Sequence, residues 1–125
     1  TTAGDTSTLE MIQEIRNNIG DLPLIAYVEA TNPFCAYEFE KDVDALLVGF
    51  SISQTAACEV IAGEHEPYGL LPMQLPKDMN TVETQYSDVA GDMEAYVDSE
   101  GNTYDFAFGL NWSGVISDER TQQYQ

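Results

Sequence analysis

Carboxylates are the residues of this sequence that could do chemistry, because paired Asp and Glu side chains act as acid, base or nucleophile in hydrolysis. The 125 residues include 22 Asp and Glu, so pairs at a catalytic separation are expected by chance and the count identifies no enzyme. Glu29 is the most informative of them, since it directly follows the apolar run Leu24–Val28. Open α/β sheets bind ligands at this end of their strands.

We therefore treat Glu29 and the nearby Asn32 as candidate residues of a substrate pocket. A structural role is the alternative for both. Glu29 would then be a loop acid that caps a helix beginning near Pro33, and Asn32 would be the N-cap of that helix. Local motifs assign no catalytic residue and no metal ligand.

Other motifs with chemical potential are incomplete. His65 lies between two acids in a stretch expected to be an exposed loop. The segment Gly49–Ser53 lacks the second glycine of a GxSxG nucleophile elbow. Asp98–Asn102 carries glycine at its fourth position, where a calcium loop needs it at the sixth, so we predict a tight turn. No dinucleotide, phosphate-loop, HExxH or zinc-cysteine motif is found, and we expect no cofactor.

The elements that must position these residues alternate between helix and strand. Ser7–Glu10 fits a capping box, and apolar residues then follow at helical spacing. Ala45–Phe50 is apolar on both faces, which is typical of a central parallel strand. The pattern predicts, in order, a helix over 8–19, a strand over 24–28, a short helix over 33–39, a strand over 45–50 and a helix over 54–62.

This βα rhythm predicts the α/β class, with a mostly parallel sheet flanked by helices. The second half differs, because its prolines allow no more than a short edge strand near 71–75. Residues 78–105 are expected to be mostly loop or hairpin, and the aromatic segment 104–112 should be buried. We thus expect one domain, with βα units over 1–76 and a loop-rich tail over 77–125 that packs on them.

Composition excludes several functions. Four Lys and Arg against 22 Asp and Glu give a formal charge of −18, which repels phosphates, so neither nucleic acid nor an anionic membrane is an expected partner. No apolar run approaches the roughly 20 residues needed to cross a bilayer. The start, Thr1–Asp5, has no signal-peptide features and is interpreted as an internal cut. Cys35 and Cys58 are expected to be small buried side chains, with a disulfide or reactive pair as the alternative.

Two segments together resemble a known family. Ala45–Phe50 (ALLVGF) is followed by a helix ending in Ile61–Gly63 and then by Glu66–Pro76 (EPYGLLPMQLP). Tyr104–Trp112 (YDFAFGLNW) is similar to a closing segment of the pattern Y-x-F-G-x-G-L-S-Y. From about Leu24 to Trp112 the chain resembles the second domain of family 3 glycoside hydrolases, the β-glucosidase and β-xylosidase group. It is most similar to the bacterial forms, so a secreted or periplasmic bacterial location is favoured.

The resemblance implies a retaining glycosidase with a (β/α)8-type barrel followed by a flavodoxin-like, three-layer α/β sandwich, here incomplete. Retention needs two carboxyl groups roughly 5 to 5.5 Å apart. The family nucleophile is an Asp on the barrel, usually before Trp. Ser87-Asp88 and Ser117-Asp118 precede Val and Glu instead, so neither Asp is assigned. The acid/base Glu would lie upstream of Thr1, and the loop after Ala45–Phe50 lacks the acid that many members carry.

We therefore expect the C-terminal part of a β-glycosidase domain that is inactive by itself. Its expected partners are the rest of the parent hydrolase and a carbohydrate substrate, and a homo-oligomer or rearranged dimer is left open. A rival hypothesis is a stand-alone noncatalytic module that binds a ligand or partner. A third is an acidic domain that binds cations through residues 78–105. The motifs could also mark a fold without the chemistry.

Overall fold

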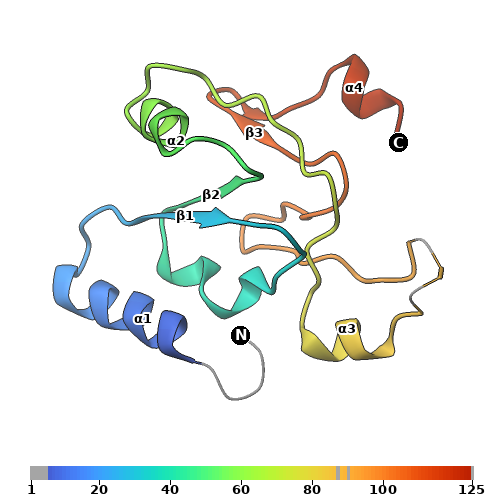
Figure 1. The fold of residues 1–125 in the computed structure, drawn as a ribbon, viewed down its shortest axis with the longest axis horizontal. Helices are drawn as coiled ribbons and strands as arrows, with labels where there is room; N and C mark the ends of the chain where they lie inside the picture. The colour runs from blue at the N-terminus through green and yellow to red at the C-terminus, as the bar shows by residue number, and fades with distance from the viewer. Residues whose placement is uncertain (1–5, 87, 90, 125) are drawn as a thin grey trace.

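The computed structural model describes residues 6–86, 88–89 and 91–124, so Thr1–Asp5, Ser87, Ala90 and Gln125 lie outside the description. The described part is mixed α/β (Figure 1). Its helices are α1 (Ser7–Ile19), α2 (Gln54–Ile61), α3 (Met79–Thr84) and α4 (Glu119–Gln122), with two 3-10 turns, η1 (Ala36–Glu38) and η2 (Glu40–Asp42). Its strands are β1 (Ile25–Glu29), β2 (Ala45–Gly49), β3 (Leu110–Asn111) and β4 (Gly114–Val115). Within these residues, no helix is both long and apolar enough to span a bilayer.

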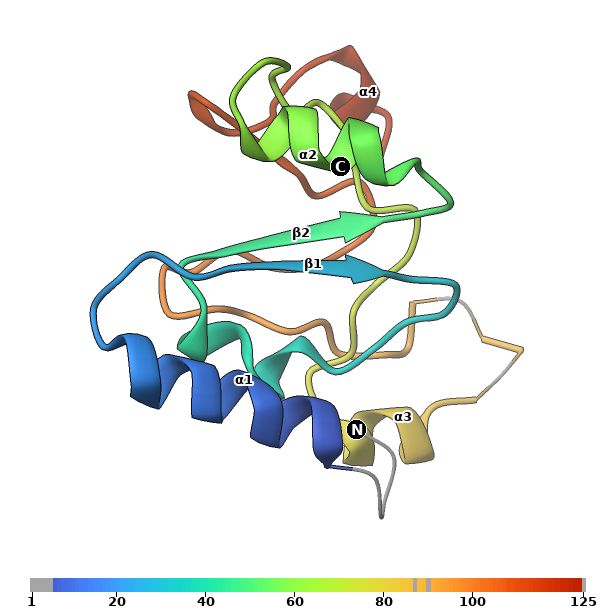
Figure 2. The same cartoon turned by 60° about the vertical axis from the view of Figure 1, so that its left-hand side comes forward.

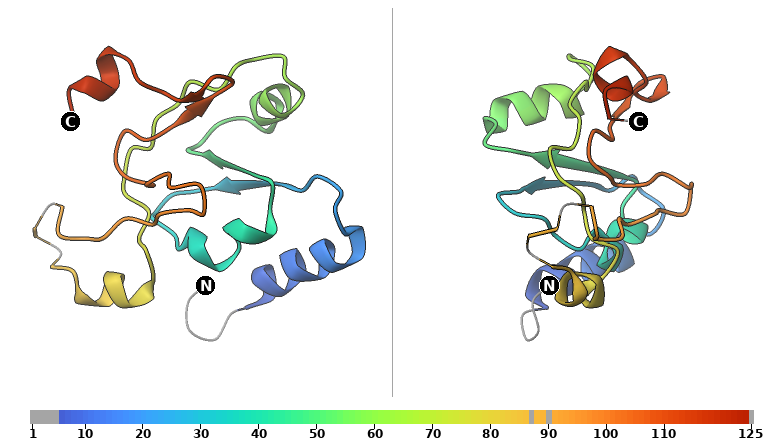
Figure 3. Two further views of the ribbon diagram at one scale, coloured as in Figure 1. Left: turned by 180° about the vertical axis from the view of Figure 1, so that it is seen from behind. Right: turned by 90° about the vertical axis from the view of Figure 1, so that its right-hand side faces the viewer.

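The sheet that carries Glu29 consists of two parallel strands. β1 pairs with β2 in a register that joins Ile25 to Ala45 and Glu29 to Gly49. The predicted parallel arrangement of these two strands is therefore confirmed. Figures 2 and 3 show α1 on the β1 side of this pair and α2 on the β2 side.

α1 begins one residue earlier than predicted. Thr6 is its N-cap, and the Thr6 hydroxyl donates to the Glu10 carboxylate at 2.7 Å instead of accepting from a backbone N–H. The predicted capping box with Ser7 as the N-cap is therefore wrong, because Ser7 is the first residue of the helix and Thr6 is the N-cap. The predicted end is correct: Gly20 has a φ of +60°, which favours glycine, and its N–H donates to the Arg16 carbonyl.

The short helix predicted over 33–39 is replaced by η1 and η2. Phe34 and Phe39 stack with ring centroids 6.2 Å apart. Residues five apart in an α-helix point about 140° away from each other, so this stacking is incompatible with one continuous α-helix. Within this segment, Cys35 and Ala36 are buried.

The segment predicted as an edge strand near 71–75 is extended but forms no regular strand. The Leu75 N–H donates to the Tyr104 carbonyl at 2.9 Å, and the Leu75 carbonyl accepts from the Tyr96 N–H at 2.9 Å. Pro72 and Pro76 lack the N–H that a continuous ladder needs, which leaves isolated bonds. Leu75 and Pro76 are the largest fully buried side chains.

The acidic stretch 78–105 contains a helix that the sequence reading missed. Asp78 caps α3 by accepting from the Thr81 N–H at 2.7 Å and the Thr81 hydroxyl at 2.9 Å. The predicted turn at 98–102 is confirmed. The Asp98 carboxylate accepts from the Glu100 and Asn102 N–H groups, and Gly101 has a φ of +85°.

The buried core is small. Its apolar members are Ala30, Cys35, Ala36, Ala57, Leu75, Ala95 and Ile116. Cys58 is exposed and both cysteines are free, so the prediction of two buried thiols is correct for Cys35 and wrong for Cys58. The accessible surface is 8516 Å², whereas a compact monomer of this mass exposes about 6,600 Å². The chain leaves apolar surface uncovered that its own elements do not reach.

Candidate functional site

The predicted site residue Glu29 lies where β1 ends, opposite Gly49 at the end of β2. Its carboxylate accepts hydrogen bonds from the Tyr27 hydroxyl and from the Ser51 N–H. Tyr27 and Glu29 are two residues apart on one strand, so their side chains share a face of the sheet. We call Tyr27, Glu29, Gly49 and Ser51 the sheet-end cluster.

Backbone geometry at two positions makes this cluster possible. A Cβ on Gly49 would lie 2.1 Å from the Tyr27 hydroxyl oxygen, so the tyrosine occupies space that only glycine leaves free. Ser51 has a φ of +58°, a left-handed conformation that is unusual outside glycine, and in it the Ser51 N–H reaches Glu29. The hydrogen bond to Glu29 is the main cause that raises the pKa of Tyr27, and partial burial adds to it.

The cluster can bind hydroxyl groups more readily than it can cleave bonds. An exposed carboxylate beside a phenol offers acceptors suited to the hydroxyls of a polar ligand, since the one phenol proton of Tyr27 is donated to Glu29. The cluster holds one carboxylate, whereas retaining hydrolysis of a glycoside uses two about 5 to 5.5 Å apart. The arrangement is therefore suited to hydrogen bonding with a polar ligand and not to bond cleavage.

Asn32 lies apart from the cluster. Its side chain is exposed in the loop after β1, and its amide donates to the Thr31 hydroxyl at 3.5 Å. It does not cap a helix, because the N-cap of η1 is Cys35. Glu29 does not cap one either, since its carboxylate bonds Tyr27 and Ser51. The alternative reading of both residues as caps is wrong, and their role in a pocket stays a prediction.

The carboxylate of Asp98 is occupied by hydrogen bonds from nearby residues of the chain. Besides its two backbone donors, Asp98 accepts from the Asn102 side chain at 2.9 Å and from the Tyr104 hydroxyl at 3.3 Å. Those bonds fill the acceptor positions that a cation would need. Over residues 6–86, 88–89 and 91–124, no group of three His, Cys, Asp or Glu side chains is placed to hold a metal ion.

The other titratable residues that the sequence singled out lie at or near the surface. His65 is exposed, with its Nε2 3.5 Å from a Glu59 carboxylate oxygen. Asp118 caps α4 and also pairs with Arg120 at 2.6 Å. That guanidinium holds the pKa of the Asp118 carboxyl below its usual range. Asp88 is exposed, and its neighbour Ser87 lies outside the described residues.

An aromatic row joins the C-terminal segment to η2. The Tyr96 hydroxyl donates to Glu40 at 3.0 Å, and the Tyr96 ring meets Tyr104 edge-on at 5.3 Å. Tyr104 stacks on Phe108 at 5.4 Å. Burial is the main cause that raises the pKa of Tyr96 to about 12, and it raises that of Tyr104 as well. Phe106 and Trp112 remain exposed, so the predicted burial of segment 104–112 is correct only in part.

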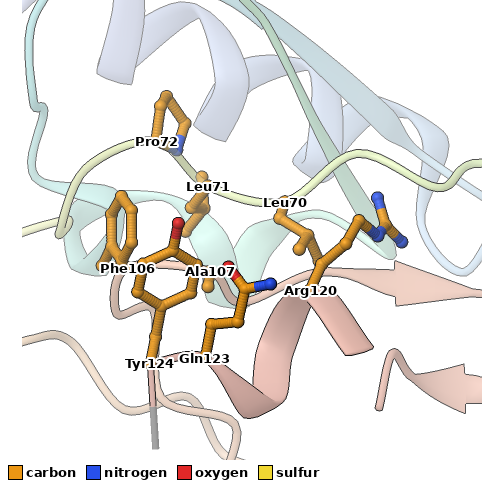
Figure 4. Close-up of a pocket in the computed structure, with 8 residues that line it drawn as sticks. All are labelled: Leu70, Leu71, Pro72, Phe106, Ala107, Arg120, Gln123 and Tyr124. Carbon is orange, nitrogen blue, oxygen red and sulfur yellow. The ribbon is translucent and has the colours of Figure 1, made fainter. Parts of the chain in front are cut away.

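A hollow of about 360 Å³ lies near the C-terminus (Figure 4). Phe106 and Tyr124 meet edge-on in its wall, with ring centroids 4.7 Å apart. Arg120 is its cation, but that guanidinium already bonds Asp118 and the Tyr68 carbonyl. Its lining residues are Leu70, Leu71, Pro72, Phe106, Ala107, Arg120, Gln123 and Tyr124. The sequence reading did not find this hollow, because it joins segments far apart in the chain.

Tyr27 and Ser51 were also missed as members of the site. The signals available were the two-residue spacing of Tyr27 and Glu29, and a glycine at the end of the neighbouring strand.

Comparison with known proteins gives one informative similarity. Over 73 residues, or 58% of the chain, the sequence is 32% identical to a protein named Beta-glucosidase C from Emericella nidulans. The match covers 12% of that protein, so the chain corresponds to a small part of its relative. No family model matches the chain, and no solved structure matches it either. The similarity indicates an origin related to β-glucosidases.

Proposed function

We propose that this chain is the C-terminal part of the second domain of a family 3 glycoside hydrolase that cleaves β-glycosidic bonds with retention. The similarity to a β-glucosidase over 73 residues carries the proposal. The motifs Glu66–Pro76 and Tyr104–Trp112 support the family and the domain. The parallel β1–β2 pair with its crossover is the unit from which a flavodoxin-like sandwich is built.

In this role the chain supplies a wall of the sugar pocket and a domain interface. Glu29 accepts hydrogen bonds from sugar hydroxyls at the end of the sheet, while Tyr27 and the Ser51 N–H hold its carboxylate in place. Asn32, in the adjoining loop, adds an exposed amide. The two reacting carboxyl groups belong to other parts of the parent hydrolase, and the chain alone is inactive.

The large exposed surface supports the proposal that the fold of this chain depends on the rest of the parent protein. A two-stranded sheet is marginally stable without further partners. The accessible surface exceeds that of a compact monomer by about 1,900 Å², which is more than one partner buries in a standard interface, about 800 Å². The remainder of the parent hydrolase is the partner that we propose.

Hydrolysis of an aryl β-glucoside by the full gene product tests this function. Glu29→Gln keeps the shape of the side chain but weakens its acceptors, so we expect KM to rise about 10-fold and kcat to change less. Glu100→Gln, on an exposed turn, is the matched control and should leave both unchanged. An inactive gene product would refute the glycosidase assignment. An active Glu29→Gln variant with the wild-type KM would refute the sugar contact.

A stand-alone noncatalytic binding module is the second candidate. Exposed aromatic side chains favour it, since Tyr68 is 76% and Trp112 65% exposed, and such rings stack on ligands and partners. This candidate predicts glycan or protein binding by the 125-residue chain without hydrolysis by any form of the gene product.

A further inference from the structure

The carboxylate of Glu29 keeps acceptor capacity that this chain does not use. The Tyr27 hydroxyl donates to its Oε2 and the Ser51 N–H donates to its Oε1, so each oxygen accepts one bond. A carboxylate oxygen has two acceptor positions, which leaves one open on each oxygen. Because the side chain of Glu29 is exposed, a ligand at the end of the sheet has access to both open positions.

The charge of Glu29 has no counter-ion in the described part of the chain. The sequence holds four Lys and Arg residues, and three of them form ion pairs with other carboxylates. These three are Arg16, Lys77 and Arg120. No ion pair to Glu29 is found among the described residues, although its carboxylate lies at the surface where a lysine or arginine side chain could reach it.

Two of the basic residues lie at the other end of the strands. Arg16 donates to the carboxylate of Asp44 and to the carbonyl of Leu22, which precede β2 and β1. Lys41 lies in η2, also before β2. The strands run roughly 13 Å from that end to Glu29, which exceeds the screening length of about 8 Å at physiological salt. Neither residue therefore neutralises Glu29.

The N-terminus of α2 is the other positive feature that follows β2. α2 begins at Gln54, and the Ser53 hydroxyl caps it by accepting from the Ala56 N–H at 3.2 Å. A helix N-terminus carries about half of a unit charge. This partial charge does not cancel the full charge of the Glu29 carboxylate, so the end of the sheet stays anionic.

This anionic end of the sheet disfavours two kinds of occupant. An anionic group would be repelled by Glu29 and by the formal charge of −18 on the chain. A divalent metal ion needs several oxygen ligands, and within the described residues no trio of His, Cys, Asp or Glu side chains is placed to hold one. Hydroxyl and ammonium groups are the remaining hydrogen-bond donors that a sugar derivative can carry.

A protonated amine fits the two open positions better than a hydroxyl does. A hydroxyl has one proton and can bond only one carboxylate oxygen, whereas an ammonium group has three protons and can bond both. Hydrogen bonds between an ammonium and a carboxylate are also about twice as strong as those between neutral groups. The open positions and the missing counter-ion thus point to the same ligand chemistry.

We infer that the sheet-end cluster is a charge-selective subsite, in which Glu29 favours a glycoside that bears a protonated amino group over a neutral one and rejects a glycoside that bears a carboxylate. This inference rests on the proposed function for the contact between Glu29 and the sugar. Glu29 acts here on specificity, and the two reacting carboxyl groups remain elsewhere in the parent hydrolase.

A panel of aryl β-glycosides tests the inference on the full gene product. It contains the β-glucoside, the β-glucuronide, and β-glucosides in which one ring hydroxyl at a time is replaced by an amino group. The assay is run at about pH 6, because an amine with a pKa near 8 is then protonated. An amino group also changes the intrinsic reactivity of a glycoside, so each kcat/KM is divided by that for the glucoside and compared between wild type and Glu29→Gln.

The relative kcat/KM of at least one amino glycoside should fall about 10-fold in Glu29→Gln, because the charge-assisted bonds are lost. The relative kcat/KM of the glucuronide should rise about 10-fold, because the repulsion is lost. Relative values that stay within about 2-fold of wild type for every amino glycoside would overturn the inference. The thermal midpoint and the activity on the glucoside show that the variant is folded.

Glu100→Gln separates the contact at Glu29 from the charge of the whole molecule. It removes one negative charge from an exposed turn and should leave all relative values within about 2-fold of wild type. Equal changes in Glu100→Gln and Glu29→Gln, both abolished when the salt concentration is raised to about 0.15 M, would assign the selectivity to the overall field and would overturn the inference.

Calorimetric binding of glucose, its amino-deoxy derivatives and glucuronate to the same samples distinguishes the two proposals. An inactive gene product that prefers an amino sugar, and loses that preference in Glu29→Gln, would refute the glycosidase assignment and keep the subsite. An active gene product whose relative values do not depend on Glu29 would keep the glycosidase assignment and refute the subsite. An inactive gene product that binds none of the sugars would refute both.

Discussion

Gly49 is the residue on which the sheet-end cluster depends most. Any side chain there would displace the Tyr27 ring from beside Glu29, since a Cβ would lie 2.1 Å from the tyrosine oxygen. Gly49→Ala should therefore lower the free energy of unfolding by about 2 kcal/mol, as overpacking does elsewhere. Urea unfolding followed by circular dichroism measures this loss.

Two variants control the Gly49 prediction. Gly69→Ala adds a methyl group into open space without a left-handed φ, so its free energy of unfolding should stay within about 0.5 kcal/mol of wild type. Removing the ring first, with Tyr27→Ala, should abolish the additional cost of Gly49→Ala. Additive losses in the double variant would show that the two residues do not compete for space.

Tyr96 and Tyr104 make stability sensitive to alkaline pH. Burial raises the pKa of Tyr96 from 10.0 to about 12 and that of Tyr104 in the same direction. The unfolded chain therefore releases these protons first, so the stabilisation is complete below pH 10 and is lost as the pH rises towards 12. The urea midpoint should fall over this range. Tyr96→Phe should show a smaller fall, and Tyr86→Phe, at an exposed tyrosine, should show the wild-type fall.

At the scale of elements, hydrogen bonds from Arg16 hold α1 against the segment that precedes β2. Its guanidinium donates to the Asp42 carbonyl at 2.7 Å, to the Gly20 and Leu22 carbonyls at 2.8 and 3.0 Å, and to the Asp44 carboxylate at 2.7 Å. The same contact lowers the pKa of Asp44. Lysine keeps the charge but not this fork of donors.

Arg16→Lys should therefore lower the free energy of unfolding by about 1 to 2 kcal/mol. Lys77→Met breaks the ion pair with Glu94, whose side chains are 49% and 66% exposed, and should cost less than about 0.5 kcal/mol. Urea unfolding of both variants gives the comparison. Equal costs would mean that Arg16 contributes no more than an ordinary surface ion pair.

Elements set by local periodicity were predictable, and those set by distant contacts were not. α1, β1, β2 and α2 follow apolar spacing within a few residues, so the sequence predicts them to within one or two positions. The helix expected over 33–39 gave way to ring stacking between Phe34 and Phe39. The bonds of Leu75 to Tyr96 and Tyr104 join segments more than twenty residues apart, which no local pattern encodes.

The candidate site was likewise predictable only where local sequence sets it. The position of Glu29 at the end of β1 followed from an apolar run and its last residue. Its partners did not, because they depend on how Tyr27 packs over Gly49 and on the backbone conformation of Ser51.

The whole molecule carries an excess of negative charge that opposes compaction. With a formal charge of −18, repulsion between carboxylates destabilises the folded chain at low ionic strength. Raising NaCl from about 0.01 M to about 0.15 M shortens the screening length from about 30 to about 8 Å. Tm should rise by roughly 5 °C over this range, as measured by circular dichroism. A falling Tm would indicate that ion pairs outweigh repulsion.

Covalent trapping of the nucleophile tests the central claim most directly. A retaining glycosidase forms a glycosyl-enzyme intermediate on one carboxylate, and an activated 2-deoxy-2-fluoro-β-glucoside accumulates it. Peptide mapping by mass spectrometry of the labelled full gene product should place the sugar on an Asp outside these 125 residues, and the isolated chain should remain unlabelled. A label on any Asp or Glu within the 125 residues would contradict the account.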